Sequence, residues 1–410
     1  MVRVTVVGGG IAGTAAAWVA ARRGDARVTL VSAGSGASAL ATGGLDFDVP
    51  GATDARALGR GSLEVLRALG AFVVPSDGGV LLATTAGVVR SARGRDAALL
   101  DWTRLAGQRV AVVRARRPGW DATALARAWR GQHGVDPVPI EATILRHLDE
   151  RVIPDADFAA RHDDTARLMW LSERLRDALR RAPGVSAFVL PPCLGITQPR
   201  AAALSTLVGL PCGEASALPG GPSGLRFQHA RDRALEAVGV ERVAARVTAI
   251  ARKDDGWHVV LDGGEGREAD AVVVATGGLV GGGIEYAPSE WWPGSELPAA
   301  AGVSFRFTLD CPQLKIGAHG RPLTRPGSLF GIPPEAIAWP FVADPLMDRV
   351  GALADEEGGA GDGIFAAGEV AADVWHAWLA ALESGVRAGE AAATRDEERV
   401  RQRSGVIVEA

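Results

Sequence analysis

Three glycines near the amino terminus carry the clearest chemical signal in this sequence. Gly8, Gly10 and Gly13 have G-x-G-x-x-G spacing, directly after the apolar residues 2–7 and before an alanine-rich stretch. The first glycine permits a tight turn, the second lets the backbone approach a pyrophosphate, and the third lets helix and strand pack closely. Because the positive end of the helix dipole also faces the anion, the spacing predicts dinucleotide binding rather than a glycine-rich turn without a ligand. The positions expected at the phosphates are Gly8, Gly10, Ile11, Ala12 and Gly13.

The strand expected next, residues 27–32, lacks a residue that such sites usually have. An acidic side chain at its end usually binds the ribose hydroxyls, but the sequence there reads Val31, Ser32 and Ala33. Ser32 can hydrogen-bond a ribose, although more weakly than a carboxylate does. The absence of an acidic residue here disfavours tightly held NAD and favours a flavin that is anchored by many other contacts.

A segment of small and hydroxyl-bearing residues, 34–46, follows this strand. A planar ligand can lie against its backbone, because few side chains obstruct the approach. We expect this segment along the ribityl chain and ring edge of a flavin, and a flexible loop is the alternative. The positions expected to contact the cofactor are Ser38, Thr42, Gly43 and Gly44.

Two later turns complete the expected site. The buried strand 271–274 runs into Ala275, Thr276 and Gly277, where anything larger would strike a cofactor bound at the first turn. A backbone group of Val247 would meet the adenine. Near the end of the chain, Gly368 and Glu369 follow another short strand and would meet the ribityl and phosphate side of the flavin. The start of the helix beyond them can stabilise negative charge on the reduced ring.

Composition excludes several other classes. The chain has 410 residues, 47% hydrophobic content and a net charge of −4, without a basic block that carries interleaved aromatics, so nucleic acid is not expected as a partner. Cys193, Cys212 and Cys311 form no C-x-x-C, which disfavours disulfides, structural zinc and an iron-sulfur cluster in this chain. No run approaches the roughly 18–20 apolar residues that cross a bilayer. We expect a cytoplasmic protein that reaches a membrane only through another subunit.

The expected elements indicate an α/β fold. We expect a Rossmann-like FAD-binding domain, with a parallel sheet and a three-stranded β-meander crossover, interrupted by an inserted α+β domain. The FAD-binding domain is expected over residues 1–72, 226–285 and 346–410, and the inserted substrate or cap domain over 73–225 and 286–345. Helices are expected at 54–69, 120–129 and 156–179, strands at 80–84, 110–114, 188–190 and 303–309, and a hairpin over 242–251 and 256–261.

The three separated pieces at residues 8–13, 275–277 and 364–369 together resemble the FAD-binding fold of the glutathione reductase type. More narrowly, the chain is similar to the family of B subunits of anaerobic glycerol-3-phosphate dehydrogenase. The absence of an acid at Ser32 is similar to that family's pattern. The segments that carry the resemblance are ALATGGLD at 39–46, RVAVVRARRPGWDATALARAW at 109–129, LPPCLG at 190–195, LPGGPSGLRF at 218–227, ATGGLVGGGI at 275–284 and IFAAGEV at 364–370.

The resemblance implies a flavin subunit, with FAD or FMN, that pairs with a catalytic FAD subunit and an iron-sulfur membrane subunit on the inner membrane. The implied reaction oxidises sn-glycerol 3-phosphate to dihydroxyacetone phosphate and passes electrons to a quinone. FMN would leave the first glycine turn without its pyrophosphate, which favours FAD. Two alternatives stay open: a non-catalytic flavin-holding or electron-transfer subunit, and a stand-alone FAD oxidoreductase acting on another alcohol or amine.

Candidate catalytic residues follow from the chemistry of this reaction. Hydride transfer from a secondary alcohol needs a base for the hydroxyl proton and cations for the phosphate. His319 is the candidate base, and His376 stands beside the last glycine turn. The candidate phosphate ligands are Arg306, Lys315, Arg321 and Arg325. One departure from the family is the run after this turn, which holds Trp375 and Trp378 in place of glycines and can narrow the site at the ring face.

Overall fold

The chain divides into two compact units. The computed structural model describes residues 1–24, 26–47, 58–76, 78–253, 256–278, 285–288, 305–310, 323–327, 363–370 and 377–405. The first unit combines Met1–Ala37, Gly59–Val65 and Ala234–Ala410, and the second combines Ser38–Leu58 and Leu66–Arg233. The sequence places residues 38–58 in the FAD-binding domain, whereas the structure groups them with the second unit. Among the described residues, no helix is both long and apolar enough to span a membrane.

A five-stranded parallel sheet forms the centre of the first unit. Its strands, in spatial order, are β11 (Glu241–Val243), β2 (Ala26–Val31), β1 (Val2–Val7), β15 (Ala271–Val274) and β19 (Ile364–Ala366). The strands β1 and β15 are runs of mostly β-branched residues that are almost wholly buried, as expected where helices cover both faces of a parallel sheet. The predicted parallel sheet is confirmed.

Two helices pack tightly against each other in this unit. They are α1 (Ile11–Arg22) and α9 (Trp378–Gly405). A Cβ on Gly385 would overlap the backbone of Ala12, and one on Gly389 would overlap the backbone of Ala16. The two helices therefore approach at distances that only glycine on α9 permits.

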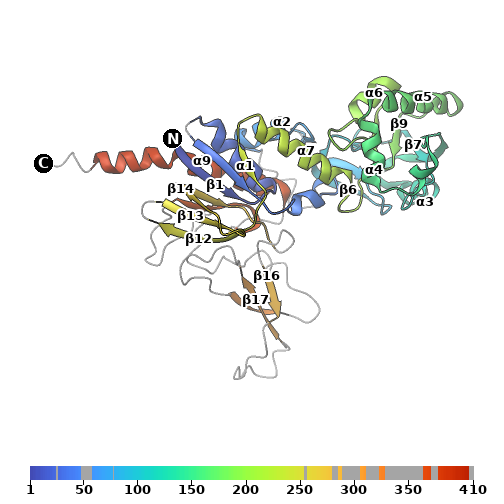
Figure 1. Ribbon diagram of the computed structural model, residues 1–410. Coiled ribbons are helices and arrows are strands. Elements are labelled where there is room, and N and C mark those ends of the chain that lie inside the picture. Colours follow the sequence, from blue (N-terminus) through green and yellow to red (C-terminus); the bar gives the residue numbers. More distant parts are fainter. Residues whose placement is uncertain are drawn as a thin grey trace. The chain divides into compact units, whose positions relative to one another are not determined.

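The crossover to β15 is the predicted β-meander. It consists of β12 (Val247–Lys253), β13 (Gly256–Leu261) and β14 (Gly266–Ala269), which pair in antiparallel order (Figure 1). The predicted hairpin is correct from Val247 onward, but Glu241–Val243 is a separate strand that pairs in parallel with β2. A second antiparallel sheet follows, made of β16 (Glu285–Pro288), β17 (Phe305–Asp310) and β18 (Leu323–Gly327).

The second unit contains a parallel sheet of its own, which was not predicted from the sequence. Its order is β10 (Cys212–Glu214), β9 (Ala187–Leu190), β7 (Arg109–Arg114) and β8 (Asp136–Glu141). One face packs on α3 (Ala122–Trp129), and the other packs on α5 (Thr165–Arg181) and α6 (Ala201–Val208). Strand order and helix placement make this a small doubly wound α/β sheet.

The rest of the second unit is antiparallel. The strands β3 (Gly44–Phe47), β4 (Phe72–Val73) and β5 (Val80–Ala83) all pair with β6 (Val89–Asp96). The remaining helices are α4 (Asp155–Ala160), α2 (Arg60–Leu69) and α7 (Pro222–Glu236), and the last two each cross from one unit to the other. The single helix predicted over 156–179 is broken, because Asp164 has extended backbone and its side chain caps α5 by accepting from the Arg167 amide.

Candidate functional site

The turn between β1 and α1 has the geometry of a phosphate-binding turn. Gly8 has φ of +120° and donates its amide to the Val31 carbonyl at 2.8 Å. A Cβ on Gly8 would overlap the Ala275 carbonyl, and one on Gly13 would overlap the Gly8 carbonyl, so both positions require glycine. The N-cap of α1 is Gly10, no side chain caps it, and its first turn holds no acidic residue. The positive end of this helix thus carries no competing anion from its own first turn.

The turn after β15 packs beneath the first one. The amide of Ala275 donates to the Val7 carbonyl at 2.8 Å, which joins the ends of the two neighbouring strands. Gly277 has φ of +82°, in the left-handed region. The hydroxyl oxygen of Thr276 is buried and has no hydrogen-bond partner in the described part of the chain. Because buried polar groups are nearly always paired, this orphaned hydroxyl fits a site that a polar ligand completes.

The turn after β19 packs against the start of α1 and is bonded to the turn after β15. Gly368 has φ of +74°, and a Cβ on it would lie 2.9 Å from the Ala12 side chain in the first turn of α1. The Glu369 carboxylate accepts the Gly278 amide at 3.1 Å, which ties this turn to the one after β15. Ser384 on α9, which no sequence pattern singles out, has a hydroxyl that accepts the Gly368 amide at 3.1 Å. Three peptides far apart in sequence therefore meet at the carboxyl edge of the sheet, where parallel α/β sheets bind ligands.

The residues expected at the ribose and the adenine, Ser32 and Val247, also lie in the first unit. The Ser32 amide donates to the Val243 carbonyl at 3.0 Å, and its hydroxyl donates to the Gly34 carbonyl. This hydroxyl can therefore accept a bond from a ribose but has already used its own proton. The next loop returns to the first turn, because a Cβ on Gly36 would lie 3.3 Å from the Gly10 backbone. Val247 is buried at the start of the meander.

The four remaining cofactor candidates belong to the second unit. Ser38 lies in a short 3-10 helix, and a hydrogen-bonded loop follows it. The Thr42 carbonyl accepts from the Ser216 hydroxyl at 2.9 Å, and the Gly43 carbonyl accepts from the Asp96 amide at 2.6 Å. Gly44 begins β3 and pairs with Arg95. Hydrogen bonds and strand pairing thus hold residues 42–44 within the second unit, and their contact with a cofactor stays a prediction.

The catalytic candidates His319, Arg321 and His376 lie outside the described residues, as do Lys315 and Trp375. Arg306 and Arg325 lie on β17 and β18, of which the backbone is described but the side chains are not. Trp378 is the first residue of α9. The assignment of a base and of phosphate ligands stays a prediction.

A buried ionic cluster in the second unit was also missed. Arg226 on α7 donates to Asp96 at 2.7 Å and to Glu214 at 2.6 Å, and all three side chains are at most 1% exposed. Arg226 also donates to the Gly195 carbonyl at 2.6 Å. Burial raises the pKa of Glu214 above its ordinary value, and Arg226 opposes that rise. Burial alone would lower the pKa of Arg226, but the two carboxylates raise it. The cluster joins β6, β10 and α7, and its groups are occupied with one another.

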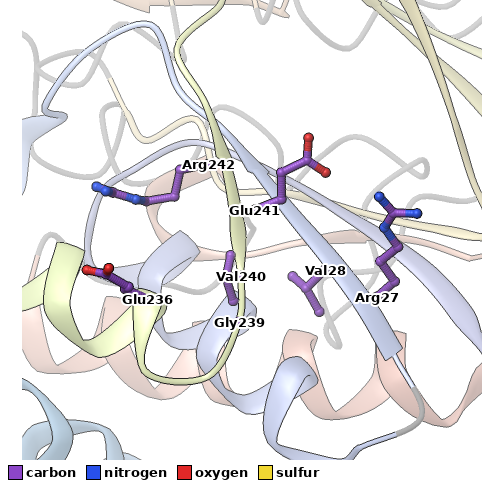
Figure 2. A pocket seen from close by; sticks show the side chains of 7 residues that line it. All are labelled: Arg27, Val28, Glu236, Gly239, Val240, Glu241 and Arg242. Atoms are coloured by element: carbon purple, nitrogen blue, oxygen red, sulfur yellow. The ribbon is translucent and has the colours of Figure 1, made fainter.

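A surface pocket of about 550 Å³ lies elsewhere on the first unit. It is lined by Arg27, Val28, Glu236, Gly239, Val240, Glu241 and Arg242 (Figure 2). Figure 2 shows the Arg27 and Arg242 side chains pointing away from each other. The lining comes from the amino ends of β2 and β11, from the loop before β11 and from Glu236 at the end of α7, at the edge of the sheet opposite to the glycine turns. The pocket is therefore separate from the candidate cofactor site.

Comparison with a protein family agrees with this geometry. Residues 225–279 match a family model described as FAD-NAD(P)-binding. This stretch contains most of α7, then β11, the meander, β15 and the turn with the orphaned hydroxyl. Most of this stretch lies, together with the β1–α1 turn, in the first unit, whose parallel sheet is of the Rossmann-like type. A search of curated proteins gave no match to this sequence.

Several solved structures are similar to the chain at low identity. The values that follow are identity, the covered share of this chain and of the other chain, and the TM-score. For iminodiacetate oxidase from Chelativorans sp. the identity is 15%, the match covers 97% of this chain and 95% of the other, and the TM-score is 0.34. For a peptidyl tryptophan dihydroxylase essential for tryptophylquinone cofactor biogenesis the identity is 14%, the coverages are 98% and 68%, and the TM-score is 0.33. For Lactococcus lactis thioredoxin reductase the identity is 11%, the coverages are 97% and 100%, and the TM-score is 0.30. In a further match, the chain spans 36% of a Diels-Alderase of pyrroindomycin biosynthesis. None of these four is a glycerol-3-phosphate dehydrogenase.

Proposed function

We propose that the protein is a flavin-dependent oxidoreductase that holds FAD in its first unit. The observation that carries the proposal is the meeting of three glycine turns, after β1, β15 and β19, around the uncapped start of α1. The family match over residues 225–279 supports the same class of cofactor. FAD is favoured over FMN, because only a dinucleotide brings a pyrophosphate to the first turn.

Different residues of this unit would bind different parts of the cofactor. The backbone of Gly8, Gly10 and Gly13 would hold the diphosphate, and Ser32 would accept a hydrogen bond from the ribose. The Thr276 hydroxyl would donate to a polar atom of the cofactor, which supplies the partner that it lacks among the described residues. Glu369 fixes the Gly278 amide and so holds two of the turns in register. Bound FAD supplies the hydride acceptor.

The finer proposal is oxidation of sn-glycerol 3-phosphate to dihydroxyacetone phosphate, with electrons passed to a quinone. It rests on the sequence resemblance to the B subunits of anaerobic glycerol-3-phosphate dehydrogenase. In that setting the chain would act with an FAD-containing catalytic subunit and an iron-sulfur membrane subunit at the inner membrane. Co-purification of the chain with two such subunits is the result expected from cells that express all three.

The test begins with the cofactor and then turns to the substrate. Denaturing extraction of the purified protein followed by mass measurement should identify FAD; FMN would contradict the dinucleotide assignment, and no flavin would contradict the proposed class. Anaerobic addition of glycerol 3-phosphate should then bleach the flavin absorption, while glycerol, which lacks the phosphate, should not. A flavin that neither compound bleaches would exclude the isolated chain as the site of substrate oxidation.

A further inference from the structure

A buried hydroxyl on α9 holds one of the three glycine turns in place. Ser384 is 5% exposed, and its oxygen accepts the Gly368 amide at 3.1 Å across 16 residues of sequence. Gly368 is buried as well, at φ of +74°. Because a buried amide that loses its partner costs free energy, this bond fastens the turn after β19 to α9.

The next residue of α9 fastens the same stretch of helix to α1. A Cβ on Gly385 would overlap the Ala12 carbonyl, and a Cβ on Gly368 would lie 2.9 Å from the Ala12 side chain. Ala12, Gly368 and the adjacent residues Ser384 and Gly385 therefore form a closed triangle of contacts. A second close approach of α9 to the α1 backbone, at Gly389, resists a shift of the whole helix. The turn can leave the start of α1 only if the Ser384 bond breaks.

The constraint continues from this turn to the one after β15. Glu369 follows Gly368 directly, and its carboxylate accepts the Gly278 amide at 3.1 Å. Ser384 thus stands at one end of a chain of contacts that runs from α9 through both turns, and all of these residues belong to the first unit. Since the Gly368 amide is occupied by Ser384, this glycine contributes the position of its turn to a cofactor site rather than a hydrogen bond from its own amide.

We propose that Ser384 is a positioning residue of the cofactor site, which holds the turn after β19 in the place that FAD requires before FAD binds. The inference rests on the proposed function, because it takes this edge of the sheet to hold FAD. Without the Ser384 oxygen, the Gly368 amide must find another partner, and the turn leaves its place in part of the molecules. Apparent affinity falls in proportion to the fraction of protein that is ready to bind, so the loss appears in FAD binding and not in stability alone.

The test is fluorescence titration of the full-length apoprotein with FAD, followed by visible circular dichroism of the bound flavin. Ser384→Ala should weaken FAD binding about tenfold and should change the flavin circular dichroism, which reports how the protein holds the cofactor. Ser384→Thr keeps the hydroxyl and should restore both readouts. If Ser384→Ala does not fold, Ser384→Cys keeps the size, retains only a weak acceptor and takes its place.

Thr394→Ala is the matched control. The Thr394 hydroxyl lies on the same helix and donates to the Glu390 and Ala391 carbonyls of α9 itself. It therefore fastens no glycine turn. Its removal should leave both the FAD affinity and the flavin circular dichroism unchanged.

The readouts separate a positioning role from a structural one. If the Ser384→Ala apoprotein unfolds at lower urea but binds FAD with wild-type affinity and circular dichroism, the positioning role is overturned and the proposed function stands. If the wild-type protein binds no flavin at all, the proposed function fails, and the positioning role fails with it. Weaker binding and an altered flavin spectrum in Ser384→Ala, with neither change in Thr394→Ala, would support the proposal.

Discussion

Gly8 lies so close to Ala275 that a Cβ on the glycine would overlap the alanine carbonyl oxygen. Gly8→Ala therefore forces two neighbouring strand ends apart and also places a side chain at φ of +120°. We expect a loss of roughly 3 kcal/mol in the free energy of unfolding and a protein that purifies without flavin. Urea unfolding and the ratio of flavin to protein absorbance measure the two effects.

Gly24→Ala is the matched control for backbone strain. Gly24 is in the same unit and has φ of +81°, but a Cβ on it would meet no atom within 4 Å. This variant should be somewhat less stable and should retain its flavin. If both variants keep flavin equally, the turn after β1 does not bind the cofactor.

The Thr276 hydroxyl provides a test in which stability and binding change separately. Thr276→Val keeps the shape of the side chain and removes a hydroxyl that has no partner within the described protein. The apoprotein should be as stable as the wild type or slightly more so, because an unpaired buried polar group is removed. The affinity for FAD should fall about tenfold, as measured by fluorescence titration of apoprotein.

Thr14→Val is the companion variant. The Thr14 hydroxyl is buried and donates to the Gly10 carbonyl at 2.8 Å, so it is already satisfied within α1. Its removal should lower stability by about 1 kcal/mol. A Thr276→Val protein that loses stability and binds FAD normally would show that its hydroxyl has a structural partner instead.

Arg226 should be essential to the fold of the second unit. Arg226→Met leaves Asp96 and Glu214 buried without their cation, and breaking a buried ion pair on one side costs about 3–5 kcal/mol. Arg233 lies about two turns further along α7. Arg233→Met removes only an exposed hydrogen bond to the Thr197 carbonyl and should cost far less. Chemical unfolding at neutral pH compares the two, and equal costs would show that the ion cluster contributes little.

Part of this architecture can be predicted from local sequence patterns. The glycine spacing after Val7 and the apolar runs of β1 and β15 predict a phosphate turn between buried parallel strands, because these signals depend on neighbouring residues only. The meander and the turn with Thr276 are likewise where the pattern of residues indicates. The α/β class, which depends on these strong elements, is confirmed.

Other parts depend on contacts between distant residues. Glu241–Val243 reads as the start of a hairpin, yet it pairs with β2, more than 200 residues earlier in the chain. Strand β10 has only three residues, too few for a periodic pattern, and it is fixed by β9. Ser384 and Ser223 lie on helices as ordinary polar residues, and only the folded chain shows which amide or loop each one faces. Such partners have no signal in local sequence.

His162 gives the second unit a defined sensitivity to acid. Its side chain is fully buried, with Nδ1 3.1 Å from the Phe158 carbonyl. Burial, and then the positive charge of Arg167, lower the pKa of His162 from 6.5 to about 4. The unfolded chain therefore binds this proton between pH 6.5 and 4 while the folded chain does not, so stability falls as pH falls through that range. The loss reaches about 3 kcal/mol near pH 4 and is absent above pH 7.

His162→Asn should remove this part of the pH dependence, because the amide group can still donate to the Phe158 carbonyl and does not titrate. The difference in free energy of unfolding between pH 7 and pH 4 should shrink by about 3 kcal/mol relative to wild type. His133→Asn is the control, since His133 is exposed and its φ of +50° suits asparagine. An unchanged pH profile in His162→Asn would mean that His162 is protonated in the folded protein, with the ion pair of Glu150 and Arg167 rearranged to accept the charge.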